Sequence, residues 1–216
     1  MNLSWGHVAR SIDPQKRDDL LRAARTIFAE HGFVGARMAD IAAGAGVATG
    51  TVYLYFESKE SLVAALVDDM LLRLTDALCA VLDRPTAKAP IEETVHTALV
   101  FLSDEGDLLR LQWLDLGLNA LAPYHPLPGY RTLLQELATR LAARMARRQI
   151  RRYDPAALAA LLIGMVQWVA EIGLLRGDGD IAKYEATVLQ LLEQALRIGD
   201  DAGLAVSEET TLRVAT

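Results

Sequence analysis

Hydrophobic residues recur at spacings of three and four along almost the whole chain, and no segment shows the strict alternation of a half-buried strand. Spacings of three and four place apolar side chains on one face of a helix. The pattern therefore predicts an all-α fold. The helices expected from it cover residues 13–32, 38–44, 49–56, 58–84, 91–103, 106–121, 130–152, 155–175 and 180–198.

Several of these helices carry their own start and stop signals. Asp13 can cap free amides at the start of the first helix, and Pro14 suits the first helical position because its missing N–H needs no partner there. Gly32 supplies the stop, and Ser58 is the expected cap of the long fourth helix. Proline and glycine mark the connections at 85–90, 122–129 and 177–179.

A short motif near the N-terminus carries the functional signal. Residues 37–56 read R-M-A-D-I-A-A-G-A-G-V-A-T-G-T-V-Y-L-Y-F, which is two short apolar helices joined by a turn at Gly46. Two helices joined in this way can place the second one in the major groove of DNA, about 12 Å wide. The motif predicts a helix-turn-helix, although an ordinary pair of short helices in a bundle would show a similar pattern.

Hydroxyl groups and one cation follow the predicted turn. Thr49, Thr51 and Tyr53 place hydroxyls on the second helix, where they suit phosphates and base edges. Lys59 adds a positive charge near a helix N-terminus, and both features attract phosphate. These residues are the candidate DNA contacts.

The sequence from D-I-A-A-G-A-G-V-A-T-G-T-V-Y-L-Y-F-E-S-K-E-S-L, with the preceding A-A-R-T-I-F-A-E-H-G-F, resembles the N-terminal domain of the tetracycline-repressor (TetR) family. The resemblance covers about fifty positions in order and spacing, as expected for a motif of this kind. It implies a dimeric repressor that a small ligand releases from DNA. Matching positions add Gly50, Leu54 and Tyr55 to the recognition helix and give Lys59 a phosphate contact.

This chain departs from the family pattern at several DNA-facing positions. Family members usually carry Ser or Thr where this chain has Ala36, Arg37 and Met38, so we expect Arg37 to replace that phosphate contact. A frequent base-reading residue falls on Ala39, and the usual capping serine falls on Ala48. Direct base readout is therefore expected to be sparse, with DNA shape contributing more.

Charge separates the proposed domains. The domains expected are a flexible arm (1–12), a helix-turn-helix DNA-binding domain (13–60), a helical ligand-binding and dimerisation domain (61–199) and a tail (200–216). Residues 1–60 hold seven basic and seven acidic side chains, so the whole net charge of −6 belongs to residues 61–216. Contact with anionic DNA must therefore be local to the first sixty residues.

The C-terminal part offers candidates for an effector site. Aromatic and polar side chains lie on the helices that should surround a ligand cavity, and such pockets combine apolar walls with a few polar groups. Each candidate is more often an ordinary core or surface residue. The predicted ligand-binding residues are Phe101, Gln112, Trp113, Met165 and Trp168.

Apolar stripes on the last two helices predict a homodimer. One recognition helix with few base contacts binds weakly, whereas two helices about 34–36 Å apart read both halves of a palindrome. Two stripes in each chain suit a four-helix interface. The predicted interface residues are Leu161, Gly164, Ile172, Val188 and Leu192.

Six arginines gather between Arg140 and Arg152, with no acid between Glu136 and Asp154. A solvated helix face explains such a run, and an anionic effector or an acidic partner surface is the alternative. The apolar segment 156–170 that follows is fifteen residues long. A membrane-spanning helix needs about 20, so a buried helix is the preferred interpretation.

Other function classes find little support in the sequence. Four scattered histidines and the single Cys79 form no metal-ligand spacing, and no nucleophile or phosphate-loop motif is present, so we expect no enzyme, no metal and no cofactor. The lone cysteine and the absence of a secretory signal in the first fifteen residues favour the cytoplasm. A helical adaptor or membrane-peripheral protein is the alternative, and activation in place of repression stays open.

Overall fold

The computed structural model describes residues 13–84, 90–111, 127–176 and 181–197. Every regular element in these ranges is a helix, which confirms the all-α prediction. The helices are α1 (Pro14–Gly35), α2 (Met38–Gly44), α3 (Thr49–Tyr55), α4 (Lys59–Leu82), α5 (Pro90–Asp104), α6 (Gly106–Arg110), α7 (Pro128–Ala146), α8 (Pro155–Arg176) and α9 (Ile181–Leu196).

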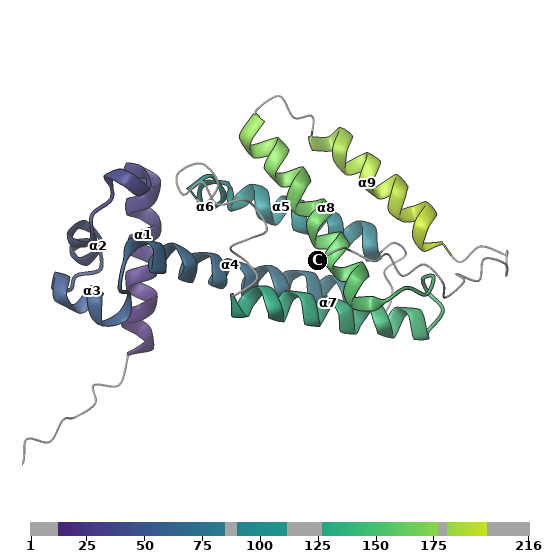
Figure 1. Cartoon of the computed structure of the whole chain (residues 1–216), viewed down its shortest axis with the longest axis horizontal. Coiled ribbons are helices and arrows are strands. Elements are labelled where there is room, and N and C mark those ends of the chain that lie inside the picture. The colour runs from purple at the N-terminus through teal and green to yellow at the C-terminus, as the bar shows by residue number, and fades with distance from the viewer. Residues whose placement is uncertain (1–12, 85–89, 112–126, 177–180, 198–216) are drawn as a thin grey trace, which may run out of the picture.

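Figure 1 shows two groups of helices joined by α4. We call α1–α3 the head and α5–α9 the body. The long α4 starts beside the head and packs against α5 and α7 of the body, so it belongs to both groups. This arrangement places α3 at the outer end of the molecule, away from the body.

The predicted start of α1 is confirmed. Asp13 caps the helix by accepting a hydrogen bond from the Gln15 N–H at 3.0 Å, and Pro14 occupies the first position. Gly32 breaks the helix at φ 66°, a conformation that glycine adopts without steric cost. The chain then makes one more helical turn to Gly35. The predicted stop is therefore a sharp kink, and the helix continues beyond it.

The head has a small apolar core built by the two short helices and α1. Leu20, Ile41, Val52 and Phe56 are buried in it. Gly46 makes the turn between α2 and α3 at φ 67°, as predicted. Because these buried side chains fix the two short helices against α1, the other face of α3 is left to solvent.

The cap of α4 is also as predicted. The Ser58 hydroxyl accepts a hydrogen bond from the Ser61 N–H, and the Ser61 hydroxyl accepts one from the Ser58 N–H. Such a reciprocal pair satisfies two amides that the first turn of a helix leaves free. The cap starts α4 directly after the head, which fixes the point where the connecting helix begins.

The predicted helix 130–152 is wrong at both ends. The structure starts α7 at Pro128, where proline again takes the first helical turn, and ends it at Ala146. Arg148 then adopts a positive φ of 56°, which reverses the chain direction. The arginines from Arg147 to Arg152 therefore lie in the connection to α8 and do not form one helix face.

Gly129 shows why α7 can pack so closely on α4. Its N–H donates to the Asp68 carboxylate at 2.6 Å. A Cβ at this position would lie 2.8 Å from the Asp68 carbonyl oxygen and 3.1 Å from the Leu71 Cβ. Only glycine allows the two backbones to approach to this distance.

We expect Gly129→Ala to lower the free energy of unfolding by about 1–3 kcal/mol, because the added methyl group must push α7 away from α4. Urea denaturation followed by circular dichroism measures this change. Gly35→Ala is the matched control, since a Cβ built at this exposed glycine makes only an ordinary contact, 3.5 Å from the His31 Cβ. Equal stability of the two variants would contradict the prediction.

The segment Pro155–Gly173 of α8 is, at 19 residues, long and apolar enough to cross a membrane by length and composition. The apolar segment 156–170, on which the buried-helix prediction was based, is shorter than this segment of α8. One face of α8 is covered by α5, α7 and α9, and 39% of the segment is buried in the protomer. A core helix with a second, uncovered face accounts for this composition.

Some predictions fall outside the described residues. They are the arm (1–12), the candidates Gln112 and Trp113, the larger part of the loop 122–129, the turn 177–179 and the tail (200–216).

Candidate functional site: a nucleic-acid interface and an apolar cavity

The outer face of α3 presents polar and aromatic groups to solvent. Thr49 and Gly50 are exposed at the start of the helix. Tyr53 and Leu54 follow one turn later with 53% and 64% of their surface exposed. Val52 is buried beneath them. The burial of one side of α3 thus displays Thr49 and Tyr53 together on the other side.

Two further candidates belong to the same head. Thr51 is half-buried, and Arg37 is exposed at the N-cap of α2. The N-cap of α3 is Ala48, which has no side chain to cap the helix. The start of α3 therefore lacks a side-chain cap.

Tyr55 has a role inside the head. Its ring is half-buried, and its hydroxyl oxygen accepts a hydrogen bond from the Asp13 N–H at 3.1 Å. This contact joins the end of α3 to the start of α1. The structure therefore separates Tyr55 from Tyr53, as expected for residues two positions apart, which lie on different faces of a helix.

Lys59 is also directed into the head. Its ammonium group donates hydrogen bonds to the carbonyl oxygens of Phe33 at 2.5 Å and Ala36 at 3.0 Å. The same nitrogen lies 4.6 Å from the centre of the Phe33 ring. Carbonyl groups at the end of a helix have no intrahelical partner, and a lysine can satisfy them. The motif alone gave no signal of this role.

The body encloses an apolar cavity of about 70 Å³ between α4, α5, α6, α7 and α8. Its walls are almost entirely aliphatic, and Thr94, Tyr130 and Gln167 supply the polar groups. Leu102 and Leu109 line it on either side of the junction between α5 and α6. Such a cavity suits a small apolar ligand oriented by few hydrogen bonds.

The predicted ligand residues that the structure describes lie elsewhere. The guanidinium of Arg73 lies 5.6 Å from the centre of the Phe101 ring, and Met165 packs at the edge of the core. Trp168 is 56% exposed. None of these three lines the cavity. The wall is mainly aliphatic, with leucine the most frequent residue, and no sequence pattern distinguishes these side chains from ordinary core residues.

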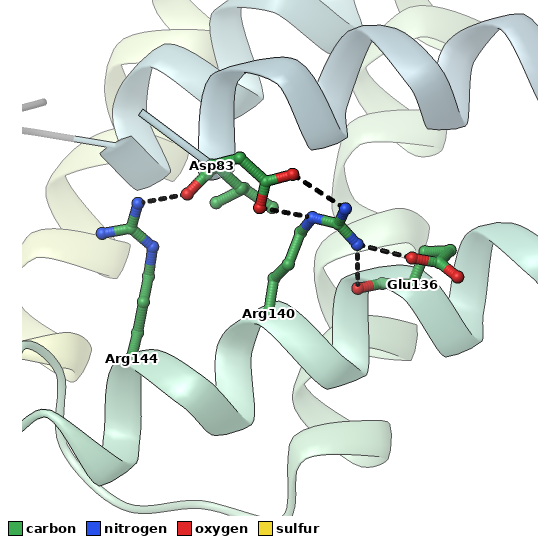
Figure 2. A network of polar contacts seen from close by, with 5 residues as sticks. Asp83, Glu136, Arg140 and Arg144 are labelled. Atoms are coloured by element: carbon green, nitrogen blue, oxygen red, sulfur yellow. Dashed lines mark hydrogen bonds and ion pairs between the residues drawn. The ribbon is translucent and has the colours of Figure 1, made fainter. Parts of the chain in front are cut away.

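The arginine-rich segment clamps α7 to the end of α4. Figure 2 shows Arg140 between two acids: it donates to both carboxylate oxygens of Asp83, at 2.9 and 2.8 Å, and to Glu136. Hydrogen bonding to Asp83 raises the pKa of Arg140 further above its ordinary value, and the same bond lowers the pKa of Asp83. This clamp accounts for Arg140 as a structural residue.

Arg144 is buried beside that clamp. It donates to the Leu82 carbonyl oxygen at 2.6 Å and to the Gln149 side chain at 3.2 Å. Burial, together with the nearby charge of Arg147, lowers the pKa of Arg144 below its ordinary value. The first half of the arginine cluster therefore packs against α4 and is not a solvated helix face.

An uncovered apolar face runs along α8 and α9. Leu161 and Leu191 are 64% and 57% exposed, and a Cβ on Gly164 would meet only open space. Val188 is half-buried. Ile172 and Leu192, which the sequence placed in the same interface, are buried within the protomer, where α8 and α9 pack against each other.

Comparison with known proteins agrees with this geometry. Residues 20–66 match the family model described as bacterial regulatory proteins, tetR family. The uncharacterized HTH-type transcriptional regulator YdgC of Bacillus subtilis (strain 168) is 29% identical over 194 residues, which are 85% of this chain and 93% of that protein.

Two further proteins extend the comparison. The HTH-type transcriptional repressor KstR2 of Mycolicibacterium smegmatis is 38% identical over 78 residues, 36% of this chain and 37% of that protein. The crystal structure of the regulator FadR from Bacillus subtilis in complex with stearoyl-CoA has a TM-score of 0.64 at 21% identity, over 83% of this chain and 99% of that one. At this identity the structure shows a shared fold. The matched helix-turn-helix, the fold and the related regulators together establish that the chain belongs to the TetR family of bacterial transcriptional regulators.

Proposed function

We propose that the chain is a cytoplasmic homodimeric repressor, that residues 13–60 bind a palindromic operator, and that a small apolar effector bound within residues 61–199 releases it. The exposed face of α3 carries this proposal. A short helix held by a buried core, with Thr49 and Tyr53 facing outward, is the geometry that a major groove accepts.

The proposed DNA contacts form a smaller set than the motif implied. They are Thr49, Gly50, Thr51 and Tyr53 on the recognition helix and the exposed Arg37 at the N-cap of α2. Tyr55 and Lys59 hold the head together through the contacts described above. With few base-reading side chains, much of the affinity would come from phosphates.

The proposed dimer interface is the uncovered face of α8 and α9. Leu161, Gly164, Trp168 and Leu191 are its centre. Apolar side chains in contact with water favour a partner that covers them, and the same helices of a second chain would do so by two-fold symmetry. The pair would present two heads to the two half-sites of an operator.

The proposed effector is an apolar molecule of acyl type. The aliphatic walls of the cavity support this choice, as does the structural neighbour FadR, which is named as a complex with stearoyl-CoA. Decanoyl-CoA and stearoyl-CoA are suitable probes, because they share a head group and compare a short acyl chain with a long one. Binding of either is measured by the shift in thermal unfolding temperature that a ligand of the native state produces.

Selection of bound sequences from a pool of random duplexes at two salt concentrations tests DNA binding. Binding through phosphates must weaken as salt rises. We expect a palindromic site to be enriched, and Tyr53→Ala to weaken binding to it by about tenfold, the loss of about 1–2 kcal/mol expected for one good contact.

Gln135→Ala, a change on the exposed side of α7, is the matched control and should bind as the parent does. No enriched sequence and no binding even at low salt would overturn the proposed function. If a sequence is enriched but Tyr53→Ala has no effect on binding, the DNA contact lies on another part of the head.

A further inference from the structure

A buried carboxylate lies where the head meets the body. Glu105 is at the junction between α5 and α6, and its side chain is only 7% exposed. Each carboxylate oxygen faces a different arginine: Oε1 lies 2.8 Å from Nη1 of Arg73, and Oε2 lies 2.7 Å from Nη2 of Arg25. One carboxylate therefore pairs with two guanidinium groups.

The two arginines come from different parts of the molecule. Arg25 lies on α1 in the head, and Arg73 lies on α4. Among the ion pairs of the described residues, Arg25–Glu105 is the pair that joins the head to the body. Burial alone would raise the pKa of Glu105, but the contacts with Arg73 and Arg25 outweigh it and lower the pKa, so the carboxylate is ionised.

The two pairs are not equally anchored. Arg73 also contacts Asp69 at 3.0 Å and lies over the Phe101 ring, so several groups hold it. Arg25 and Arg73 are about equally exposed, at 42% and 43%, so it is these further contacts that hold Arg73 more firmly. Water can solvate Arg25 when it leaves, whereas Glu105 stays neutralised by Arg73. The contact between head and body is therefore the one that can open.

The same junction forms part of the cavity wall. Leu102 precedes Glu105 by three residues and Leu109 follows it by four, and both line the cavity. Met70 and Leu74, on either side of Arg73, line it too. A group that enters the cavity and displaces these side chains must also move the backbone that carries Glu105, because packed elements shift as units.

We propose that the Arg25–Glu105 pair is a latch that sets the position of the head on the body, and that occupancy of the cavity opens it through Leu102 and Leu109. The inference deepens the proposed function, on which its biological meaning rests. Glu105 acts as a positioning residue, since it lies away from the outer face of α3 and from the cavity itself. A closed latch would hold the head at the spacing that operator DNA requires.

Distance measurements between spin labels test the latch without DNA. In a Cys79→Ser chain, labels at Val34→Cys on the head and Gln135→Cys on α7 report the separation of head and body. Both sites are exposed. Dilution with unlabelled chain confines each measured distance to one molecule, so the result does not depend on dimer formation.

Four chains are compared with this labelled parent. Arg25→Gln opens the latch, and Ala98→Met imitates an occupied cavity, because Ala98 is buried in its wall. The third chain combines both changes. Arg22→Gln is the matched control, since Arg22 is an exposed arginine on α1 that pairs within its own helix, with Asp19.

The latch predicts that Arg25→Gln and Ala98→Met shift the distance distribution in the same way, while Arg22→Gln leaves it unchanged. In the combined chain Ala98→Met should add no further shift, because residues that act in one pathway are not additive. Ala98→Val replaces Ala98→Met if cooperative unfolding is lost.

If Ala98→Met shifts the distance equally in the parent and in the Arg25→Gln chain, the inference is overturned. The coupling between cavity and head would then run through α4. A shift from Arg25→Gln with none from either cavity variant would overturn it as well. In operator binding, Arg25→Gln should weaken the affinity of the effector-free protein by about 5–150-fold, the usual range of coupling between sites. A chain that binds no DNA but shows the predicted distances would overturn the proposed function and leave the latch in place.

Discussion

A Leu161→Glu variant is expected to be a monomer that binds operator DNA about 10²–10⁴-fold more weakly than the parent, because linking two heads raises affinity by about that factor. Leu161 is 64% exposed on α8, beside Gly164, at the centre of the proposed dimer interface. A carboxylate there would lose its water when two copies meet and would find no cation in return. An unpaired buried charge is costly enough to separate the chains.

Analytical ultracentrifugation gives the oligomeric state, and a fluorescence titration with operator duplex gives the affinity. Leu72→Glu is the matched control: Leu72 is an exposed leucine on α4, outside the face formed by α8 and α9, and its variant should stay dimeric. A parent chain that is itself monomeric and sediments with lipid vesicles would contradict the prediction. That result would assign the apolar face of α8 to a lipid surface.

A Lys59→Met variant is expected to lose about 2–3 kcal/mol of unfolding free energy, in line with hydrogen bonds made by a charged group. Methionine keeps an apolar stem over the Phe33 ring but cannot donate to the carbonyl oxygens of Phe33 and Ala36. Those carbonyls would lose the charged donor that Lys59 supplies at a partly covered helix end. We expect the head to unfold at a lower urea concentration.

Urea denaturation checks the stability, and the salt dependence of operator binding separates the two possible roles of Lys59. A lysine that contacts phosphate contributes about one unit to the slope of affinity against salt, whereas a lysine inside the head changes stability and leaves the slope intact. Lys16→Met, at an exposed lysine on α1, is the control and should unfold as the parent does. A stable Lys59→Met variant with a reduced salt slope would restore the phosphate contact that the motif implied.

The local features of the head could be predicted because they depend on near neighbours in the chain. Asp13 and Ser58 cap helices that begin directly after them, and Gly46 makes its turn within the motif. A cap or a tight turn involves residues two or three positions apart, so its signal is present in the sequence itself. The end of α7 could not be predicted in this way. The turn there depends on a positive φ at Arg148, and an arginine in the sequence does not indicate that conformation.

The roles of individual side chains were harder to predict. Tyr53 and Tyr55 are two positions apart in one motif, yet one is exposed and the other contacts Asp13, 42 residues away. Ile172 and Leu192 belong to apolar stripes that also serve the proposed dimer interface, and only the packing of α8 on α9 shows which positions are covered within the chain. Helical periodicity gives the face of a helix but does not name the surface that covers it.

The sequence alone determined the helical class, the helix-turn-helix and its family, because these depend on periodicity, capping and a motif of fixed spacing. The tertiary structure decided where the cavity lies, that Lys59 serves the end of α1, and that Glu105 joins Arg25 to Arg73. Each of these features brings together residues from separate helices. Their proximity follows from how the helices pack, and packing is set by the whole core at once.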